Sequence, residues 1–342
     1  MAVFLVDGGI FVGRFEKQKY KKGKNFWWWL KRHQAGEFPT KEYKEATHKF
    51  FTRELNHIKF KIESMELPID SIIVCYDGIF GRRNRGQLYP DYKRHKSGIK
   101  ATKHKGIDIR KMILECDYDP MKLDESWSGL YDDWKEADDL IAETALQLKS
   151  DGIDVVVFSE DKDMYQLLDE EQKIRIHNLR EEITRDYFKE IWGIRPDEYV
   201  DWKCLVGDVS DNIKGLPGVG KVKAKKLLAQ WKALESIPEE VLVTYYPKEI
   251  EKIVGLMQEY REVNDLKVGV CRTKFGNYWS LLESKKKLNP ISFKDATKLF
   301  KAIPEIQPHF RKEDYSEKVI VWKKIIQLPF EISKEVGLHL DR

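Results

Sequence analysis

The most specific stretch of this sequence is residues 207–227, GDVSDNIKGLPGVGKVKAKKL. Gly215, Gly218 and Gly220 permit a tight hairpin whose backbone N–H groups can face a phosphate. A helix that begins near Gly220 adds the positive end of its dipole. A glycine-rich turn alone is a weak signal, but acids and lysines share this stretch. They are Asp208, Asp211, Lys221, Lys223, Lys225 and Lys226.

Short apolar runs upstream of this hairpin predict buried strands. Continuous runs of β-branched residues suit parallel strands that are covered on both faces. Residues 41–65 and 136–149 carry apolar side chains at helical spacing. Strands that alternate with helices predict an α/β core with a mostly parallel central sheet flanked by helices, over residues 1–195. The predicted strands are Ala2–Val6, Ser71–Tyr76, Ile153–Phe158 and Lys173–His177.

Acidic side chains follow the predicted strands or open a helix beside them. Each acid alone is most simply a turn residue or a helix-capping residue. Together, at the carboxyl edge of a parallel sheet, they indicate a ligand site. Gathered carboxylates repel each other without a cation, and oxygen ligands favour Mg²⁺ or Mn²⁺. The pattern therefore predicts a phosphodiesterase site with two ions ~3.5–4 Å apart. The acids are Asp7, Asp77, Glu136, Asp138, Asp139, Asp161 and Asp163.

The charge of the chain is segregated. The 342 residues carry a formal net charge of only +4, although 35% of them are charged. Residues 82–111 hold eleven Lys and Arg against Asp91 and Asp108, a local +9. Residues 112–143 hold eleven Asp and Glu against two lysines, a local −9. Such blocks are either solvated surface or a phosphate-binding gate beside an acidic site.

The cysteines exclude two classes of protein. Cys75, Cys116, Cys204 and Cys271 are widely spaced and form no CxxC pair. This spacing suggests neither a zinc knuckle nor a disulfide framework.

The apolar start is too short for a signal peptide, and no apolar run approaches the ~20 residues of a membrane span. We therefore expect no membrane association.

Taken in order, these motifs resemble the 5′-nuclease or flap-endonuclease superfamily, in its bacterial and phage 5′→3′ exonuclease branch. That branch includes the 5′-nuclease domain of bacterial DNA polymerase I and phage RNase H. The matching pieces span roughly residues 2–230. They are Val6-Asp7-Gly8, Tyr76-Asp77-Gly78, Leu88-Tyr89-Pro90-Asp91-Tyr92-Lys93, Glu136-Ala137-Asp138-Asp139, Ser159-Glu160-Asp161-Lys162-Asp163 and Gly207 to Gly220.

The resemblance implies a PIN-like core with two Mg²⁺ or Mn²⁺ ions. Asp208 and Asp211, with Asp163, would help to hold the second ion, and Asp139 would lie in an outer shell or at the second site. The hairpin would bind the duplex backbone, with K⁺ often held by its carbonyl groups. The ligands of the first ion, direct or through water, would be Asp7, Asp77, Glu136, Asp138, Asp161 and Asp163.

The resemblance also implies a helical arch at about residues 80–130, through which a 5′ single strand passes. Arg85 and Lys93 would meet the scissile phosphate. Lys96 stands where the family often has Arg, and Asn84 stands where it often has Phe. Tyr89 and Tyr92 would offer stacking faces worth ~1–3 kcal/mol per base. The remaining expected nucleic-acid contacts are Arg82, Arg83, Lys96, Gly215, Gly218, Gly220, Lys221 and Lys223.

The leading hypothesis is a metal-dependent, structure-specific 5′ nuclease that acts during replication or repair. We expect a monomer in the cytoplasm of a bacterial or phage-infected cell, with replication proteins as candidate partners. Its substrates would be branched or 5′-flap DNA and RNA/DNA primer duplexes. The alternatives are a PIN-like ribonuclease and a non-catalytic module that only binds branched DNA.

Two regions stay open. Residues 14–33 include Phe26-Trp27-Trp28-Trp29, which is either a stacking wedge or part of the core. We expect residues 236–342 to form a mainly helical region that packs on the core. Its tail, residues 317–342, is interpreted as core rather than as a partner-docking segment.

Overall fold

The computed structural model describes residues 2–11, 40–78, 80–94, 127–275 and 290–330. Its internal contacts divide the chain into two units. The first unit is Met1–Tyr199 together with Lys324–Arg342, and the second is Val200–Lys323. The division falls beside the predicted boundary at residue 195, but the last nineteen residues group with the first unit.

The first unit is built on a six-stranded sheet with the order β3-β2-β1-β4-β5-β6. The first five strands in chain order run parallel, and only β6 is antiparallel. All four predicted strands are confirmed. The strands are β1 (Ala2–Asp7), β2 (Ile69–Tyr76), β3 (Trp127–Tyr131), β4 (Asp154–Phe158), β5 (Ile174–His177) and β6 (Glu182–Ile183).

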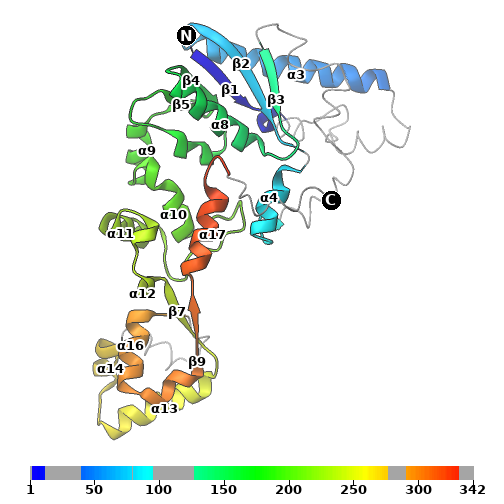
Figure 1. The fold of residues 1–342 in the computed structure, drawn as a ribbon. Coiled ribbons are helices and arrows are strands. Elements are labelled where there is room, and N and C mark those ends of the chain that lie inside the picture. Colours follow the sequence, from blue (N-terminus) through cyan, green and yellow to red (C-terminus); the bar gives the residue numbers. More distant parts are fainter. Residues whose placement is uncertain (1, 12–39, 79, 95–126, 276–289, 331–342) are drawn as a thin grey trace. The chain divides into compact units, whose positions relative to one another are not determined.

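Helices α3 (Thr40–Glu63) and α8 (Ala137–Ser150) pack against this sheet, as the helical spacing predicts (Figure 1). Ile58 and Ile62 of α3 join the core cluster that holds Phe4, Val74 and other residues on one side of the strands. Helix α8 contacts β1, β2 and β4, and its apolar residues Leu140, Ile141 and Ala145 are buried. The central strands are therefore shielded from water, which is why they are continuously apolar.

The sequence pattern did not predict β3 and β6. In β3, Ser128 and Gly129 interrupt the apolar run, and only Trp127 is buried. This strand lies at the edge of the sheet, where one neighbour is enough to hold it. The strand β6 has two residues, which is too short for any periodicity to register.

Shorter elements complete the first unit. Helix α4 (Gly81–Leu88) follows β2, and the 3₁₀ helix η2 (Lys162–Leu167) follows β4. Helix α9 (Arg185–Trp192) begins at Thr184, whose hydroxyl accepts a hydrogen bond from the Tyr187 N–H. It ends at Gly193, which adopts the left-handed conformation that favours glycine.

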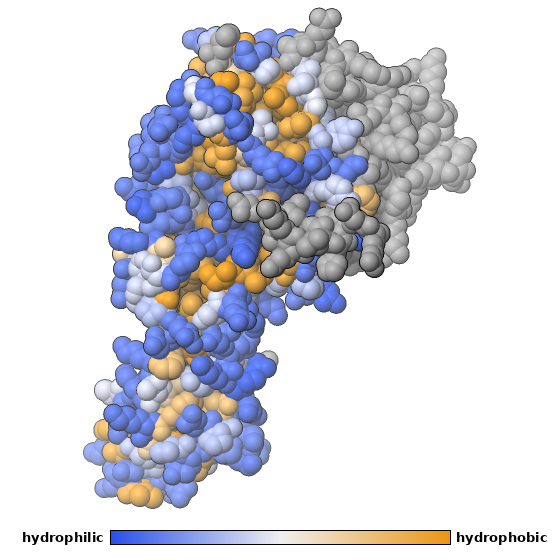
Figure 2. Space-filling model, viewed as in Figure 1, coloured by the Kyte–Doolittle hydropathy of each residue, from blue (hydrophilic) through white to orange (hydrophobic). Residues whose placement is uncertain are grey.

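The second unit is mostly helical. Helix α10 (Tyr199–Val206) enters it from the first unit, and helix α17 (Ser316–Ile326) leads back to the first unit. On the face drawn in Figure 2, hydrophilic residues cover most of its surface, with hydrophobic ones interspersed. The remaining helices are α11 (Lys221–Trp231), α12 (Glu239–Leu242), α13 (Ile250–Val263), α14 (Val268–Phe275) and α16 (Phe293–Ala302).

This unit also contains a small antiparallel sheet, which the expectation of a mainly helical region after residue 235 did not include. Its order is β8-β7-β9. Strand β9 reads Phe-Arg-Lys-Glu-Asp, so its mostly charged sequence carried no apolar strand signal. A separate core cluster includes Met257, Phe275 and Phe310. The strands are β7 (Val243–Pro247), β8 (Ile291–Ser292) and β9 (Phe310–Asp314).

Several predictions fall outside the described residues. They concern residues 14–33 with their tryptophans, Lys96, most of the arch at 95–126, and the tail at 331–342. Among the helices of the described part of the chain, none combines the length and the apolar character that crossing a membrane requires.

Candidate active site

The order of the strands places a site beside the ends of β1 and β4. These neighbours are parallel, and their connections leave toward opposite edges of the sheet, which is where ligands bind in open α/β sheets. Asp7 is the last residue of β1, and Asp161 follows β4. The buried Ser159 hydroxyl donates a 2.8 Å hydrogen bond to Asp7 Oδ2 and accepts one of 3.0 Å from the Asp161 N–H. Ser159 therefore holds the two acidic loops together.

Asp77 brings the first turn of α8 to the same edge. Its Oδ1 accepts a 2.9 Å hydrogen bond from the N–H of Ala137, the first residue of α8. The loop that leads into α8 packs closely on Gly78, where an added Cβ would lie 2.0 Å from the Asp132 carbonyl oxygen. Glycine is required there, and this close approach delivers Asp138 to the ends of β1 and β2.

The pKa shifts of Asp7 and Asp138 show that both groups are repelled by neighbouring aspartates at this edge. The pKa of Asp7 is raised to about 6, because burial disfavours its charge and because Asp77 and Asp161 repel it. The hydrogen bond from Ser159 acts in the opposite direction. Burial, with the charges of Asp161 and Asp7, raises the pKa of Asp138 well above its usual range. A cation would relieve this repulsion, and an all-carboxylate donor set fits Mg²⁺ or Mn²⁺. We refer to Asp7, Asp77, Asp138 and Asp161 as the aspartate cluster.

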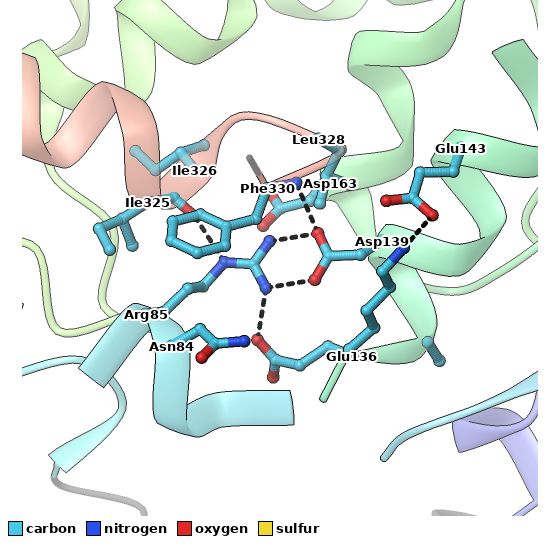
Figure 3. A network of polar contacts seen from close by, with 12 residues as sticks. Asn84, Arg85, Glu136, Asp139, Glu143, Asp163, Ile325, Ile326, Leu328 and Phe330 are labelled. Atoms are coloured by element: carbon cyan, nitrogen blue, oxygen red, sulfur yellow. Dashed lines mark hydrogen bonds and ion pairs between the residues drawn. The ribbon is translucent and has the colours of Figure 1, made fainter. Parts of the chain in front are cut away.

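Glu136 and Asp139 are bound by a buried arginine (Figure 3). Arg85 of α4 donates from Nη1 to Glu136 Oε2 at 2.8 Å. Its Nη1 and Nη2 also donate to the two carboxylate oxygens of Asp139, both at 2.7 Å. The arginine is 2% exposed. Burial opposes its charge, but the hydrogen bonds and charges of Asp139 and Glu136 raise the pKa of its guanidinium.

Two more predicted arch residues converge on Glu136. The Tyr92 hydroxyl donates to Oε2 at 2.7 Å, and Lys93 Nζ donates to Oε1 at 2.9 Å. Burial alone would raise the pKa of Glu136, but the charges of Lys93 and Arg85 lower it to about 2. The Tyr92 ring is 8% exposed, with Lys93 Nζ 4.8 Å from its centroid. In this structure its side chain supports Glu136 and is not presented as a stacking face.

Other predicted contacts lie nearer the surface. Arg82 and Arg83 are exposed, and Tyr89 is half-buried. Arg82 Nε is 3.5 Å from Glu136 Oε1, and the Arg83 guanidinium lies 6.0 Å from the centroid of the Trp134 ring. With Arg94, these two arginines are the exposed basic residues of the described part of this stretch.

In the second unit, residues 207–220 form the predicted hairpin. Asp208 and Ile213 exchange two backbone hydrogen bonds of 2.8 Å. Gly215 has a φ of +69°, and a Cβ added there would lie 2.4 Å from the Gly207 nitrogen. Backbone therefore packs directly on backbone, which only glycine permits. Gly220 is the residue before α11, and Lys221 and Lys223 are exposed in its first turn.

Asp208 and Asp211 are both buried in this hairpin. A carboxylate oxygen of Asp208 lies within 4.8 Å of a carboxylate oxygen of Asp211. Asp208 forms an ion pair with the buried Lys203 of α10, and its Oδ1 accepts a 2.6 Å hydrogen bond from the Ser210 N–H. Burial opposes the charge of Asp208, but Lys203 and Ser210 hold its pKa below the usual value. Asp163, the third acid predicted for the second ion, belongs to the first unit and lies in η2.

Sequence reasoning missed three contributors. Ser159 opens the motif Ser159-Glu160-Asp161-Lys162-Asp163, but nothing in the sequence indicated that its hydroxyl would bond to Asp7 and to the Asp161 N–H. Lys203 lies in α10, where nearly every residue is buried, and nothing in the local sequence marked it as the partner of Asp208. The third is the segment Ile325–Phe330. Ile325 bonds to Arg85, 240 positions away, and Phe330 bonds to Asp139, 191 positions away, so only the folded chain brings these groups together.

The geometry agrees with what comparison finds. Residues 41–193 match the model described as 5′-3′ exonuclease, N-terminal resolvase-like domain, and residues 194–293 match 5′-3′ exonuclease, C-terminal SAM fold. The chain belongs to the 5′-3′ exonuclease family.

Similar proteins include DNA polymerase I, thermostable, from Thermus aquaticus, 39% identical over 38% of this chain and 16% of that protein. Flap endonuclease Xni from Vibrio campbellii is 28% identical over 54% of this chain and 69% of its own length. The T5 D15 protein co-crystallised with metal ions superposes over 95% of this chain and 97% of that one, at 16% identity and a TM-score of 0.49. The chain spans far less than two thirds of the DNA polymerase I relatives it matches.

Proposed function

We propose that this chain is a metal-dependent 5′ nuclease, a 5′→3′ exonuclease and flap endonuclease that hydrolyses phosphodiester bonds in DNA or RNA-primed DNA. The aspartate cluster carries the proposal. Four carboxylates lie at the ends of β1, β2 and β4 and at the start of α8, and the charges of Asp77 and Asp161 help to raise the pKa values of Asp7 and Asp138. Such an arrangement costs stability unless divalent cations neutralise it.

The candidate ligands divide into two sets. The aspartate cluster, with Glu136 and Asp163, would hold one ion, and Asp163 with Asp208 and Asp211 would hold the second. When bound, two such ions activate water and stabilise the leaving oxygen. The Ser159 hydroxyl is bonded to both Asp7 and the Asp161 N–H, so it fixes these two loops relative to each other. Asp77 binds the Ala137 N–H and so holds the first turn of α8 beside them.

Basic groups of each unit would bind the phosphates. Arg82 and Arg83 offer exposed guanidinium groups next to α8, and Lys93 is bonded to Glu136 at the same place. In the second unit, the hairpin and the first turn of α11 supply backbone N–H groups with Lys221 and Lys223. These features favour a duplex anchored at the hairpin, with K⁺ as a further candidate ligand of its carbonyl groups.

The substrates we propose are branched or 5′-flap DNA and RNA/DNA primer duplexes. The chain would act as a monomer in the cytoplasm, beside replication proteins. The duplex-anchoring hairpin favours this reading over a PIN-like ribonuclease, whose substrate would be RNA alone.

The test is cleavage of 5′-labelled and 3′-labelled flap, nicked and RNA-primed duplexes with Mg²⁺, with a hairpin RNA as a further substrate. The wild type should release products at a junction, and Asp161→Asn should lose cleavage while it still binds the flap. Asp186→Asn, an exposed acid of α9, serves as the matched control and should cut normally. Normal cutting by Asp161→Asn refutes the site. Binding without cleavage by the wild type supports the non-catalytic module, and cleavage of hairpin RNA alone supports the ribonuclease.

A further inference from the structure

Arg85 directs its hydrogen bonds into the protein. Its Nε donates to the Ile325 carbonyl oxygen at 3.0 Å, and its terminal nitrogens donate to Glu136 and Asp139. These bonds engage four of the five N–H groups of a guanidinium. The Phe330 ring covers it, with the guanidinium carbon 4.8 Å from the ring centroid (Figure 3). The arginine thus faces protein groups on several sides at once.

The segment Ile325–Phe330, which we call the clamp segment, covers this arginine. It begins with the last two residues of α17, Ile325 and Ile326, and belongs to the first unit. Besides the Ile325 carbonyl, it contributes the Phe330 N–H, which donates to Asp139 Oδ1 at 2.8 Å. Asp139 is therefore held by Arg85 from α4 and by the clamp segment together.

The same segment is also tied to the loop of the other acids. Gln166 of η2 accepts a 2.8 Å hydrogen bond from the Leu328 N–H and donates one of 3.2 Å to the Ile326 carbonyl oxygen. It also donates to the Asp163 carbonyl oxygen at 2.8 Å. The clamp segment thus connects η2, which follows β4, with the first turn of α8, which follows β3.

We propose that Arg85 is a positioning residue, and that the clamp segment holds it so that Glu136 and the first turn of α8 are set for metal binding. This inference rests on the proposed function and deepens it, because it assigns residues 325–330 to the support of the nuclease site. It departs from the expectation that Arg85 meets the scissile phosphate. A side chain that is 2% exposed and bonded to two carboxylates acts through those carboxylates. Groups that orient metal ligands in this way typically change metal affinity 10–100-fold when altered.

The experiment is calorimetric titration of the full chain with Mn²⁺ in the absence of DNA. Arg85→Lys keeps the charge but loses the paired geometry, and it should bind Mn²⁺ about tenfold more weakly. Phe330→Ala should weaken binding in the same direction. The double variant should be no weaker than Arg85→Lys alone, because both changes release the same group. Arg180→Lys, an exposed arginine of the same unit, should bind as the wild type does.

A parallel measurement of flap-DNA affinity in EDTA separates the two roles. A positioning role leaves this affinity unchanged. Unchanged Mn²⁺ binding with weaker DNA binding by Arg85→Lys would instead place the side chain on the phosphate and overturn the inference. A merely structural role would lower the melting temperature while Mn²⁺ affinity stays the same, and this also overturns it. If the wild type binds Mn²⁺ but cuts no DNA, the proposed function fails while the inference stands. Absence of Mn²⁺ binding by the wild type refutes both.

Discussion

Arg85 and Asp139 are joined by two parallel hydrogen bonds of 2.7 Å, from Nη1 to Oδ2 and from Nη2 to Oδ1. The two residues come from α4 and α8, fifty-four positions apart, and both are buried. Each charge has left water and depends on its partner. The pair therefore links the base of the predicted arch to the helix that carries Asp138.

Removing one partner of this pair should be costly. Arg85→Met leaves a buried carboxylate uncompensated and should lower the free energy of unfolding by about 3–5 kcal/mol. The double variant Arg85→Met with Asp139→Leu should recover much of that loss, since neither charge then remains. Urea unfolding in EDTA measures both. Arg94→Met, which alters the exposed pair with Asp91, should change stability far less. Equal losses for the two arginine variants would contradict this account.

The aspartate cluster should make metal-free stability depend on pH. Because the pKa of Asp7 is raised to about 6, the folded state holds a proton that the unfolded chain releases near pH 4. Stability from this group is therefore lost as pH rises from about 4 to about 6. Asp7→Asn should then be more stable than the wild type at pH 7.5 in EDTA, with the difference vanishing near pH 4. Thermal melts across this range provide the measurement, and a difference that does not vary with pH would count against it.

Two glycines of the hairpin should differ in their tolerance of alanine. Gly215 and Gly218 have φ values of +69° and +73°, so alanine is strained at both positions. An added Cβ meets nothing within 4 Å at Gly218, but it meets backbone at Gly215. Gly218→Ala should therefore cost about 1–2 kcal/mol, the price of a left-handed alanine, and Gly215→Ala clearly more. Urea unfolding compares them directly. Equal costs would mean that the close packing on Gly207 is unimportant.

The lysines that open α11 should contribute to duplex binding through phosphate charge. Replacing both Lys221 and Lys223 with alanine should weaken duplex binding and reduce the slope of log K against log[salt] by about 2. Fluorescence anisotropy over a salt series gives the slope. Lys301→Ala, an exposed lysine of α16, is the matched control and should leave the slope unchanged. An unaltered slope in the double variant would remove the hairpin from the duplex interface.

Much of the core could be predicted from local pattern. Runs such as Ile153–Phe158 are apolar because strands covered on both faces exclude water, so composition alone indicates them. The positions of Asp7 and Asp77 at the ends of two strands could be predicted directly from those runs. In contrast, β3 and β9 escaped prediction, because an edge strand and a charged strand draw their order from a neighbour's backbone. Backbone hydrogen bonding of that kind leaves little trace in side-chain pattern.

The sequence by itself determined the kinds of group present and their order along the chain: aspartates after strands, a basic block, and a hairpin of glycines with lysines. Local chemistry is enough for this, because turn geometry, strand burial and charge are properties of short stretches. Only the tertiary structure decided which groups meet. It took Arg85 and Tyr92 from an apparent phosphate-binding surface into contact with Glu136, and it brought Phe330 onto Asp139. Such pairings depend on how separate elements pack, and burial then selects the partner that best compensates each charge.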